Sequence, residues 1–375
     1  MQRPTVAEID LAALRYNYHQ VTKLSDSPRK ILAIVKANAY GHGAVRISQE
    51  LEMLGADFLG VAMCEEAVEL RKAEIKSSIL VMGGVFQGQE DDVFKYDLIP
   101  VIFDIERARS LNARAAQNGI KLKVHVKLDT GMGRVGILPG DIEAFFGSMK
   151  DCNQLQVDGL LTHLAIADAT DDMATSFTCG QINTFTSLVK KITEMGFSPT
   201  CLHLANSAAI IRKLDPCFNL VRPGIMLYGI SPSPSLCIDL KPVLNLKTKL
   251  IALKKVPKGC SISYRRTFIS ERESLIATLP IGYADGYSRQ FSNRSTVVIH
   301  GRRALVAGVV CMDMTMVDVT DIPAVNLHDE VVLLGAQGSQ SINAHELAEI
   351  ANSIPYEILC GISSRVPRQY LNGSL

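Results

Sequence analysis

The stretch ILAIVKANAYGHGAVRISQELEMLGADFLGVAMCEEAVELRK (residues 31–72) contains two strand-and-helix repeats in succession. Its short apolar runs, Ile31–Val35 and Phe58–Val61, predict buried strands. The segments that follow them, Ala44–Leu54 and Cys64–Lys72, have helical spacing. Six more expected strands continue the alternation: Ile79–Met82, Leu98–Ile102, Leu122–Leu128, Leu155–Leu161, Cys201–Leu204 and Leu220–Val221. Eight repeats favour a closed, TIM-like (β/α)8 barrel over an open doubly wound sheet, so the fold class is α/β.

The pattern changes near SPSPS (residues 231–235), a turn-rich junction. Beyond it, strand-like runs follow one another closely, which predicts a mainly β domain with one helix at Asn343–Asn352. The expected strands are Lys247–Val256, Ser261–Phe268, Ser274–Pro280, Thr296–His300, Arg303–Val319 and Glu330–Leu334. The predicted domains are residues 1–233 and 234–375. In an alternative division, about the first ten residues pack with the β domain.

Composition excludes several classes of protein. Of the 375 residues, 47% are hydrophobic, which is enough for a large core, and a net charge of +1 gives no field that would attract nucleic acid. No apolar run approaches the roughly 18 residues of a membrane-spanning helix, and no secretion signal is evident. The nine cysteines are scattered singly, so we expect reduced thiols and no structural zinc site. These features are typical of a cytoplasmic protein without membrane or nucleic-acid partners.

Charged and imidazole side chains follow several of the predicted barrel strands. They are Lys36 after the first strand, Lys127 and Arg134 after the fifth, His163 after the sixth, His203 at the seventh and Arg222 after the eighth. The active site of a (β/α)8 barrel lies at the carboxyl ends of its strands. We therefore expect these side chains to converge on one rim.

Two later loops match a common phosphate-binding device. Asn206 and Ser207 open a short helix and offer a hydroxyl at its N-cap, while Gly224 and Ile225 offer backbone N–H groups. Ordinary capping and a tight turn explain the same residues equally well.

The motif GMGRVG (residues 131–136) has the glycine spacing of a dinucleotide site. That site needs a helix opening directly on the glycines, whereas Pro139 and Gly140 postpone the next helix here. A dehydrogenase is therefore the weakest alternative.

Cationic residues alternate with apolar ones along the fifth strand, at Lys121, Lys123 and Lys127. A buried ammonium group near Arg134 needs something to neutralise it. The simplest interpretation leaves Lys121 and Lys123 exposed and only Lys127 in need of a partner. Carboxylation of Lys127 would supply an anion beside Arg134.

The motif VKANAYGHG (residues 35–43) resembles the pyridoxal-phosphate lysine motif of alanine racemases. Other motifs of that family occur in the same order: PTVAEIDL (4–11), KLDTGMGRVG (127–136), HLANSAA (203–209), RPG (222–224), IGYADGY (281–287), CMD (311–313) and Tyr356–Arg368, which ends in SSRVPR. The resemblance covers essentially the whole chain. It implies a (β/α)8 barrel followed by a β domain, with pyridoxal 5'-phosphate as cofactor and L- and D-alanine as substrates.

The resemblance also implies two catalytic residues. Lys36 would form the Schiff base with the cofactor and then act as acid/base for the D-enantiomer, and Tyr264 would serve the L-enantiomer. Racemisation needs both, because a single base that returns its proton to one face regenerates the starting enantiomer.

Other roles carried over by the resemblance concern binding. Arg222 would face the pyridine nitrogen, and His163 would stack on the ring. Arg134 would contact the cofactor's phenolic oxygen and the substrate carboxylate, which the backbone N–H of Met312 would also bind. The remaining cofactor-binding residues are Tyr40, Asn206, Ser207, Gly224, Ile225 and Tyr356.

In the family the active site forms between two subunits, so the resemblance implies a homodimer in which the partner donates Tyr264 and Met312. Four positions depart from the usual pattern: Val309 replaces a common arginine, Arg265 a glycine, Met314 a glutamine and Val6 a tryptophan. Asp168, Arg289, Tyr283 and Tyr356 still resemble residues of the substrate corridor, and Tyr356 narrows the pocket.

The resulting hypothesis is an alanine racemase that supplies D-alanine for peptidoglycan. Alternatives are a racemase of another small amino acid such as serine, a non-catalytic cofactor-binding protein, and an amino-acid decarboxylase. The narrow pocket, the β domain with Tyr264 and the motifs named above count against these three.

Overall fold

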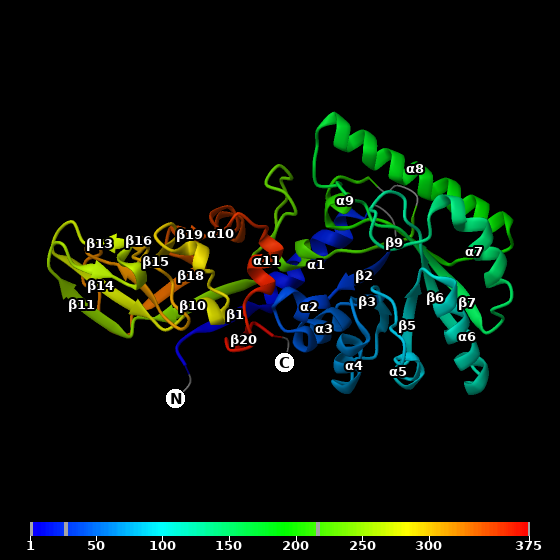
Figure 1. Ribbon diagram of the computed structural model, residues 1–375, viewed down its shortest axis with the longest axis horizontal. Helices are drawn as coiled ribbons and strands as arrows, with labels where there is room; N and C mark the ends of the chain where they lie inside the picture. Colours follow the sequence, from blue (N-terminus) through cyan, green and yellow to red (C-terminus); the bar gives the residue numbers. More distant parts are fainter. Residues whose placement is uncertain (1–2, 26–28, 215–217, 374–375) are drawn as a thin grey trace. The chain divides into compact units, whose positions relative to one another are not determined.

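The computed structural model describes residues 3–25, 29–214 and 218–373 (Figure 1). The chain forms two compact units. The barrel unit comprises Arg15–Ala39 and Ala44–Leu240, and the β unit comprises Met1–Leu14, Tyr40–Gly43 and Lys241–Leu375. Among the described residues, no helix has both the length and the apolar character required to cross a membrane.

The barrel unit contains one parallel sheet of eight strands. Their order in the sheet is β8 (Cys201–His203), β7 (Leu155–Leu161), β6 (Leu122–Lys127), β5 (Leu98–Ile102), β4 (Ser78–Val81), β3 (Phe58–Val61), β2 (Lys30–Ile34) and β9 (Leu220–Val221). All eight predicted strands are confirmed, with their ends displaced by no more than one residue. The predicted α/β class, a barrel-like parallel sheet followed by a mainly β region, is therefore confirmed.

Hydrogen bonds join the segments around β8 and β9, the strands at the two ends of this sheet order. Asn219 accepts from the backbone N–H of Leu202 at 2.9 Å and donates to Thr200 O at 2.7 Å. The backbone N–H of Arg222 donates to Ala205 O at 2.9 Å. These bonds place the end of β9 beside the end of β8, which is where the loops expected to carry the site begin.

Helices cover the outside of this sheet (Figure 1). They are α1 (Leu11–Leu24), α3 (Ala44–Met53), α4 (Cys64–Lys72), α5 (Glu90–Lys95), α6 (Ile105–Asn118), α7 (Ile142–Met149), α8 (Asp172–Glu194) and the short α9 (Ser207–Ile211). Capping explains some of their bounds. Asp104 accepts from Arg107 N at the start of α6, and Asp171 accepts from Ala174 N at the start of α8.

The β unit is built on a ten-stranded sheet. Its order is β11 (Ala252–Val256), β14 (Ser274–Leu279), β17 (Thr315–Asp318), β16 (Arg302–Val306), β15 (Thr296–Ile299), β18 (Glu330–Gln337), β10 (Leu244–Lys249), β1 (Val6–Asp10) and β20 (Arg368–Leu371), with β19 (Gln340–Ile342) paired to β18. β1 lies between β10 and β20 in this sheet, antiparallel to the first and parallel to the second. The predicted helix is present as α10 (Ala344–Ala351), and α11 (Pro355–Cys360) follows it.

Three long strands predicted in this unit were wrong. Lys247–Val256 is divided between β10 and β11, because the chain changes partner from β18 to β14 near Leu250. Ser261–Phe268 contains only the ends of a small hairpin, β12 (Ser261–Ile262) and β13 (Phe268–Ile269). Arg303–Val319 is divided by a loop at residues 307–314. Gly308 in that loop has a φ of +85°, and a Cβ there would lie 2.7 Å from Ile262 O.

Candidate active site

Cationic side chains at the carboxyl ends of the barrel strands lie close enough to shift the pKa values of their neighbours. Lys127 ends β6, and its burial, helped by the charges of Arg134 and Arg222, lowers its pKa to about 8. Burial also lowers the pKa of His163 to about 3, helped by Arg222, Arg134 and Lys127. Lys36, which follows β2 and is exposed, adds to the effect on both groups. The structure thus gathers these five predicted residues at one electropositive rim.

Lys121 and Lys123 do not belong to this cluster. Both are exposed near the start of β6, whereas Lys127 is buried with 6% of its surface exposed. The simplest interpretation of the strand is therefore confirmed, and only Lys127 has its ammonium group in a site that disfavours charge.

Arg222 is held by four acceptors and lies almost completely buried. Its Nη2 donates to Thr162 O at 2.8 Å and to Leu204 O at 3.1 Å. The imidazoles of His163 and His203 each present Nδ1 to the guanidinium, at 3.2 Å and 3.3 Å respectively. Because arginine only donates, both Nδ1 atoms act as acceptors, which favours the neutral tautomers with hydrogen on Nε2.

The glycine motif wraps an internal carboxylate. Asp129 Oδ1 accepts from the backbone N–H groups of Gly131 at 2.9 Å, Met132 at 2.9 Å and Gly133 at 3.1 Å, and Oδ2 accepts from Arg134 N at 3.2 Å. Burial raises the pKa of Asp129, but these four bonds outweigh it and hold the pKa below its usual value. The N–H groups that a dinucleotide phosphate would need are therefore already bonded to Asp129.

Asp129 is an organising residue that the sequence analysis missed, although it lies within the quoted motif. A carboxylate directly before a run of glycines is the signal that would have identified it. Its carboxylate holds the backbone of the loop at Arg134, seven residues after Lys127.

Ser207 and Gly224, which the sequence assigned to two phosphate-binding loops, are joined by a hydrogen bond. The N-cap of α9 is Asn206, whose Oδ1 accepts from Ala209 N at 3.0 Å. Ser207 is the first helical residue, and its Oγ accepts from Gly224 N at 2.9 Å and more weakly from Met226 N at 3.4 Å. The prediction of a hydroxyl at the N-cap was therefore wrong. The serine hydroxyl instead joins this loop to the turn at Gly224 and Ile225.

The segment that follows Lys36 adopts a left-handed turn. Ala37, Asn38, Ala39 and Tyr40 have φ values of 51°, 53°, 53° and 52°, which L-residues rarely adopt in succession. Asn38 Oδ1 accepts from Ala44 N at 2.8 Å, and Ala39 N donates to Val35 O at 2.8 Å. These bonds hold the turn, so the lysine leaves β2 in a direction set by a strained backbone.

Tyr40 and Tyr356 lie together within the β unit. Their ring centroids are 5.8 Å apart, and burial raises the pKa of Tyr40 well above its ordinary value. The resemblance implies that both residues bind the cofactor. The structure shows that they contact each other.

Tyr264 and Met312 are exposed on neighbouring loops of the β unit, with 67% and 52% of their surfaces accessible. Ser263 Oγ donates to Val309 O at 2.6 Å, which joins the two loops, and the backbone N–H of Tyr283 donates to Cys311 O at 3.0 Å. Tyr283 is itself 42% exposed. The unit therefore presents an aromatic and thioether surface formed by Tyr264, Tyr283 and Met312, which we call the Tyr264 surface.

Seven described cysteines form no disulfide bond. Cys64, Cys152, Cys179, Cys201, Cys237, Cys260 and Cys311 are free, and Cys217 lies outside the described residues.

Family models match both parts of the chain. The alanine racemase N-terminal domain matches residues 9–232, and the alanine racemase C-terminal domain matches residues 243–370. Among curated proteins, the alanine racemase of Halothermothrix orenii is 47% identical over 372 residues, which are 99% of this chain and 97% of the relative. That of Geobacter sulfurreducens is 46% identical and covers 100% and 98%.

Solved structures agree along the full length. The crystal structure of alanine racemase from a D-cycloserine-producing Streptomyces lavendulae superposes with a TM-score of 0.94 at 33% identity, covering 100% of this chain and 98% of that one. The alanine racemase from Bacillus anthracis, solved with bound L-Ala-P, has a TM-score of 0.91 at 37% identity and covers 100% and 97%.

Proposed function

The chain belongs to the alanine racemase family, and from this premise we propose that it interconverts L-alanine and D-alanine with pyridoxal 5'-phosphate as its cofactor. The observation that carries the proposal is the electropositive rim around Lys36, Lys127, Arg134 and Arg222. Such a rim suits a ligand with a phosphate, a phenolate oxygen and a substrate carboxylate.

The rim and the loops that carry Ser207 and Gly224 offer groups of the kinds that the cofactor needs. Ser207, Gly224 and Ile225 would hold its phosphate together with Asn206, Tyr40 and Tyr356, and His163 would stack on its ring. The neutral imidazole of His163 suits a stacking role, because burial and the neighbouring cations keep it uncharged. When bound, the cofactor supplies an electron sink for the charge that develops at the substrate Cα.

Two residues of this chain would move the proton. Lys36 Nζ would remove or return it on the face that belongs to D-alanine, and Tyr264 Oη would do so on the other face. Arg134 and the backbone N–H of Met312 would hold the substrate carboxylate. The left-handed turn after Lys36 would fix the direction from which the amine approaches.

Arg222 would face the pyridine nitrogen as a permanent donor. Its guanidinium is oriented by two carbonyls and two imidazoles, so it would keep its direction when the cofactor binds. A donor that keeps its own proton leaves the ring nitrogen largely unprotonated, which limits side reactions such as transamination.

Carboxylation of Lys127 is part of the proposal. An amine must be neutral to react with carbon dioxide, and burial lowers the pKa of Lys127 to about 8. The product would be an anion beside Arg134, which removes a buried positive charge and orients the guanidinium.

The Tyr264 surface supports a homodimer with shared active sites. An exposed tyrosine and methionine on joined loops are typical of a surface that a partner covers. In the proposed dimer, Tyr264 of the partner subunit and Met312 of the partner subunit would complete each site.

Further parts of the proposal concern specificity and role. Tyr356 would narrow the pocket and favour alanine over serine. The D-alanine formed would serve peptidoglycan synthesis in the cytoplasm, a reducing compartment that suits the free thiols.

The first test is proton NMR of L-alanine in deuterated water with the purified, cofactor-loaded protein, followed by chiral analysis. Loss of the α-proton signal with accumulation of D-alanine is the expected result. If borohydride reduction fixes the cofactor on Lys36 but neither change occurs, the alanine assignment is wrong. L-serine measured in parallel tests the proposed preference.

A further inference from the structure

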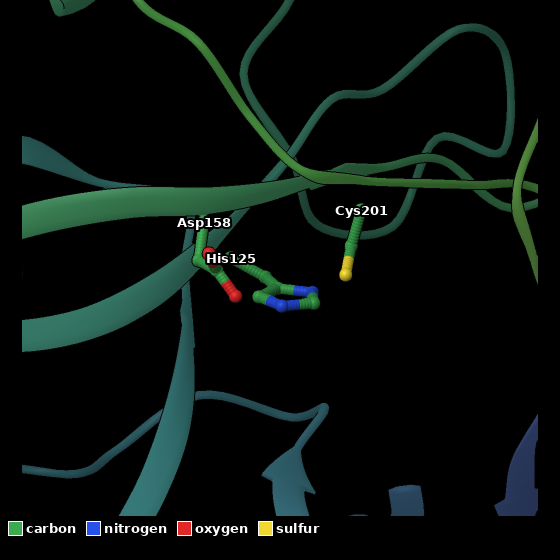
Figure 2. Close-up of side chains that lie close together, drawn as sticks. All are labelled: His125, Asp158 and Cys201. Atoms are coloured by element: carbon green, nitrogen blue, oxygen red, sulfur yellow. The ribbon is translucent and has the colours of Figure 1, made fainter. Parts of the chain in front are cut away.

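Buried polar side chains form a continuous line from Arg222 into the barrel sheet. Arg222 Nη1 lies 3.3 Å from His203 Nδ1, and His203 Nε2 lies 2.9 Å from His125 Nδ1. A ring nitrogen of His125, a carboxylate oxygen of Asp158 and Cys201 Sγ lie within 4.8 Å of one another (Figure 2). These last three residues come from the adjacent strands β6, β7 and β8, and all are buried.

Arg222, the first member of this line, favours one set of hydrogen-bond directions along it. Arg222 can only donate, so His203 Nδ1 accepts and the neutral ring carries its hydrogen on Nε2. His203 Nε2–H then donates to His125 Nδ1, which leaves the hydrogen of neutral His125 on Nε2. Both rings are neutral, because burial lowers the pKa of His125 to about 4 and that of His203 well below its usual value.

The line therefore ends in an N–H donor that has no hydrogen-bond partner within the described residues. His125 Nε2 is buried, and a buried donor without an acceptor is costly. Asp158 supplies the nearest negative charge. Its Oδ1 accepts from Thr200 Oγ1 at 3.0 Å, and its Oδ2 lies 3.9 Å from Lys123 Nζ.

A metal ion at the same three residues fits less well. Binding at Nε2 needs a lone pair where the hydrogen-bond directions place a hydrogen, and Nδ1 is occupied by His203. Lys123 and Lys30 also add positive charge around His125 and Cys201, which disfavours a divalent cation.

We propose that Asp158 is a positioning residue for the reaction, because its charge favours the Nε2–H form of His125 and thereby keeps an accepting nitrogen of His203 in front of Arg222. The opposite tautomers would place a His203 N–H against the guanidinium and an unshared lone pair on His125 Nε2 in the negative field of Asp158, which is unfavourable at both ends. Arg222 and Asp158 thus select the same state from opposite ends of the line. The consequence for turnover rests on the proposed function.

The backbone is shaped to accept His125 at this place. A Cβ on Gly159 would lie 2.5 Å from His125 Nδ1, so the ring occupies the space that any other residue at 159 would fill. The register between β6 and β7 also shifts between Val124 and His125. The ring position is therefore a built feature of the sheet.

The test is nitrogen-15 NMR of histidine-labelled holoenzyme, which distinguishes the two tautomers without turnover. His125 and His203 are expected to carry hydrogen on Nε2, with signals assigned from His125→Gln and His203→Gln. Asp158→Asn should give His125 a mixed tautomer signal and lower kcat by about 3- to 30-fold with KM unchanged. Asp158→Glu should restore both.

Cys201→Ala is the matched control, because it removes the other polar side chain near His125 without changing charge. It is expected to leave the tautomers and kcat unchanged. A hydrogen on Nδ1 of either ring, or an unchanged His125 signal in Asp158→Asn, would overturn the proposal. The proposal would also be overturned if the wild-type protein held one metal ion per chain and Cys201→Ala did not. If the tautomers are as expected but alanine is not racemised, the proposed function fails while the assignment of the line stands.

Discussion

The barrel rim and the Tyr264 surface would carry the two halves of one reaction, and the chain builds them by different means. At the rim, two residues are tied to buried partners: the guanidinium of Arg222 to two carbonyls and two imidazoles, and the backbone N–H of Arg134 to the carboxylate of Asp129. Tyr264 is instead 67% exposed, on a hairpin where Ser263, Arg265 and Arg266 have φ values of 64°, 59° and 51°.

The difference shows what one chain can organise alone. Buried hydrogen bonds in the barrel unit hold the Arg222 guanidinium in place before any ligand binds, which is the arrangement that electrostatic catalysis needs. The Tyr264 loop is held by its backbone, while the side chain projects into solvent. A phenol in water is a poor proton carrier for a buried carbon, so the proposed chemistry requires another surface to cover it.

The largest expected effect separates the two regions by mutation. Lys36→Ala and Tyr264→Ala should each lower racemisation by about 10²- to 10⁴-fold, because each removes one proton carrier. If sites are shared, unfolding and refolding an equal mixture of the two variants should restore about a quarter of wild-type activity, since half the dimers are mixed and each has one complete site.

Refolded single variants are the controls for that experiment, and exchange is verified with differently tagged subunits. Proven mixed dimers without recovered activity would mean that both residues serve the same site from one chain, or that Tyr264 has no such role.

A second prediction concerns the backbone that supports the rim. In Gly136→Ala the new Cβ would lie 2.6 Å from Asp129 N, at a φ of 140°. The bonds around Asp129 should distort, and the free energy of unfolding should fall by about 1–3 kcal/mol. Urea unfolding measures the change. Gly140→Ala is the control, because a Cβ there meets nothing within 4 Å, and equal losses in both variants would contradict the explanation.

A third prediction uses pH to test Lys127. Carbamate formation needs the neutral amine and releases a proton, and the pKa of Lys127 is lowered to about 8. At fixed total bicarbonate, the carbon-13 carbamate signal should therefore rise with pH and level off above about 8. Lys127→Ala should lack the signal. A signal that levels off only near the ordinary pKa of lysine, about 10.4, would place the modification on an exposed amine instead.

The two regions also differ in how far the sequence predicts them. Buried parallel strands carry continuous apolar runs, and for that reason all eight strands of the barrel were located to within one residue. In the β unit, strand-like alternation continues through loops: Ile262, Tyr264 and Phe268 have the spacing of one face of a strand, yet three left-handed residues turn this segment away from the sheet. Periodicity does not record the sign of φ.

The candidate site shows the same limit. Strand ends predicted which side chains gather at the rim, because the fold alone brings them there. The contact between His125 and His203 joins residues 78 positions apart and depends on a register shift between β6 and β7, which no local pattern encodes. The enclosure of Asp129 by four N–H groups likewise depends on the positive φ values of Gly131, Gly133 and Gly136.

The smallest expected effect lies at Arg265, directly after Tyr264, where the resemblance to the family leads us to expect a glycine. Arg265 has φ 59° and ψ 5°, a left-handed conformation that costs an L-residue about 1–2 kcal/mol and costs glycine almost nothing. Glycine also gains entropy in the unfolded chain, which offsets part of the benefit, so Arg265→Gly should stabilise by about 0.5–1 kcal/mol. Lys255→Gly, in the exposed extended strand β11, should destabilise by a similar amount. Urea unfolding of both variants measures the two changes. If only Arg265→Gly stabilises the protein, the loop stores backbone strain to present Tyr264. If both variants are destabilised, Arg265 makes a compensating contact once the Tyr264 surface is covered by a second subunit.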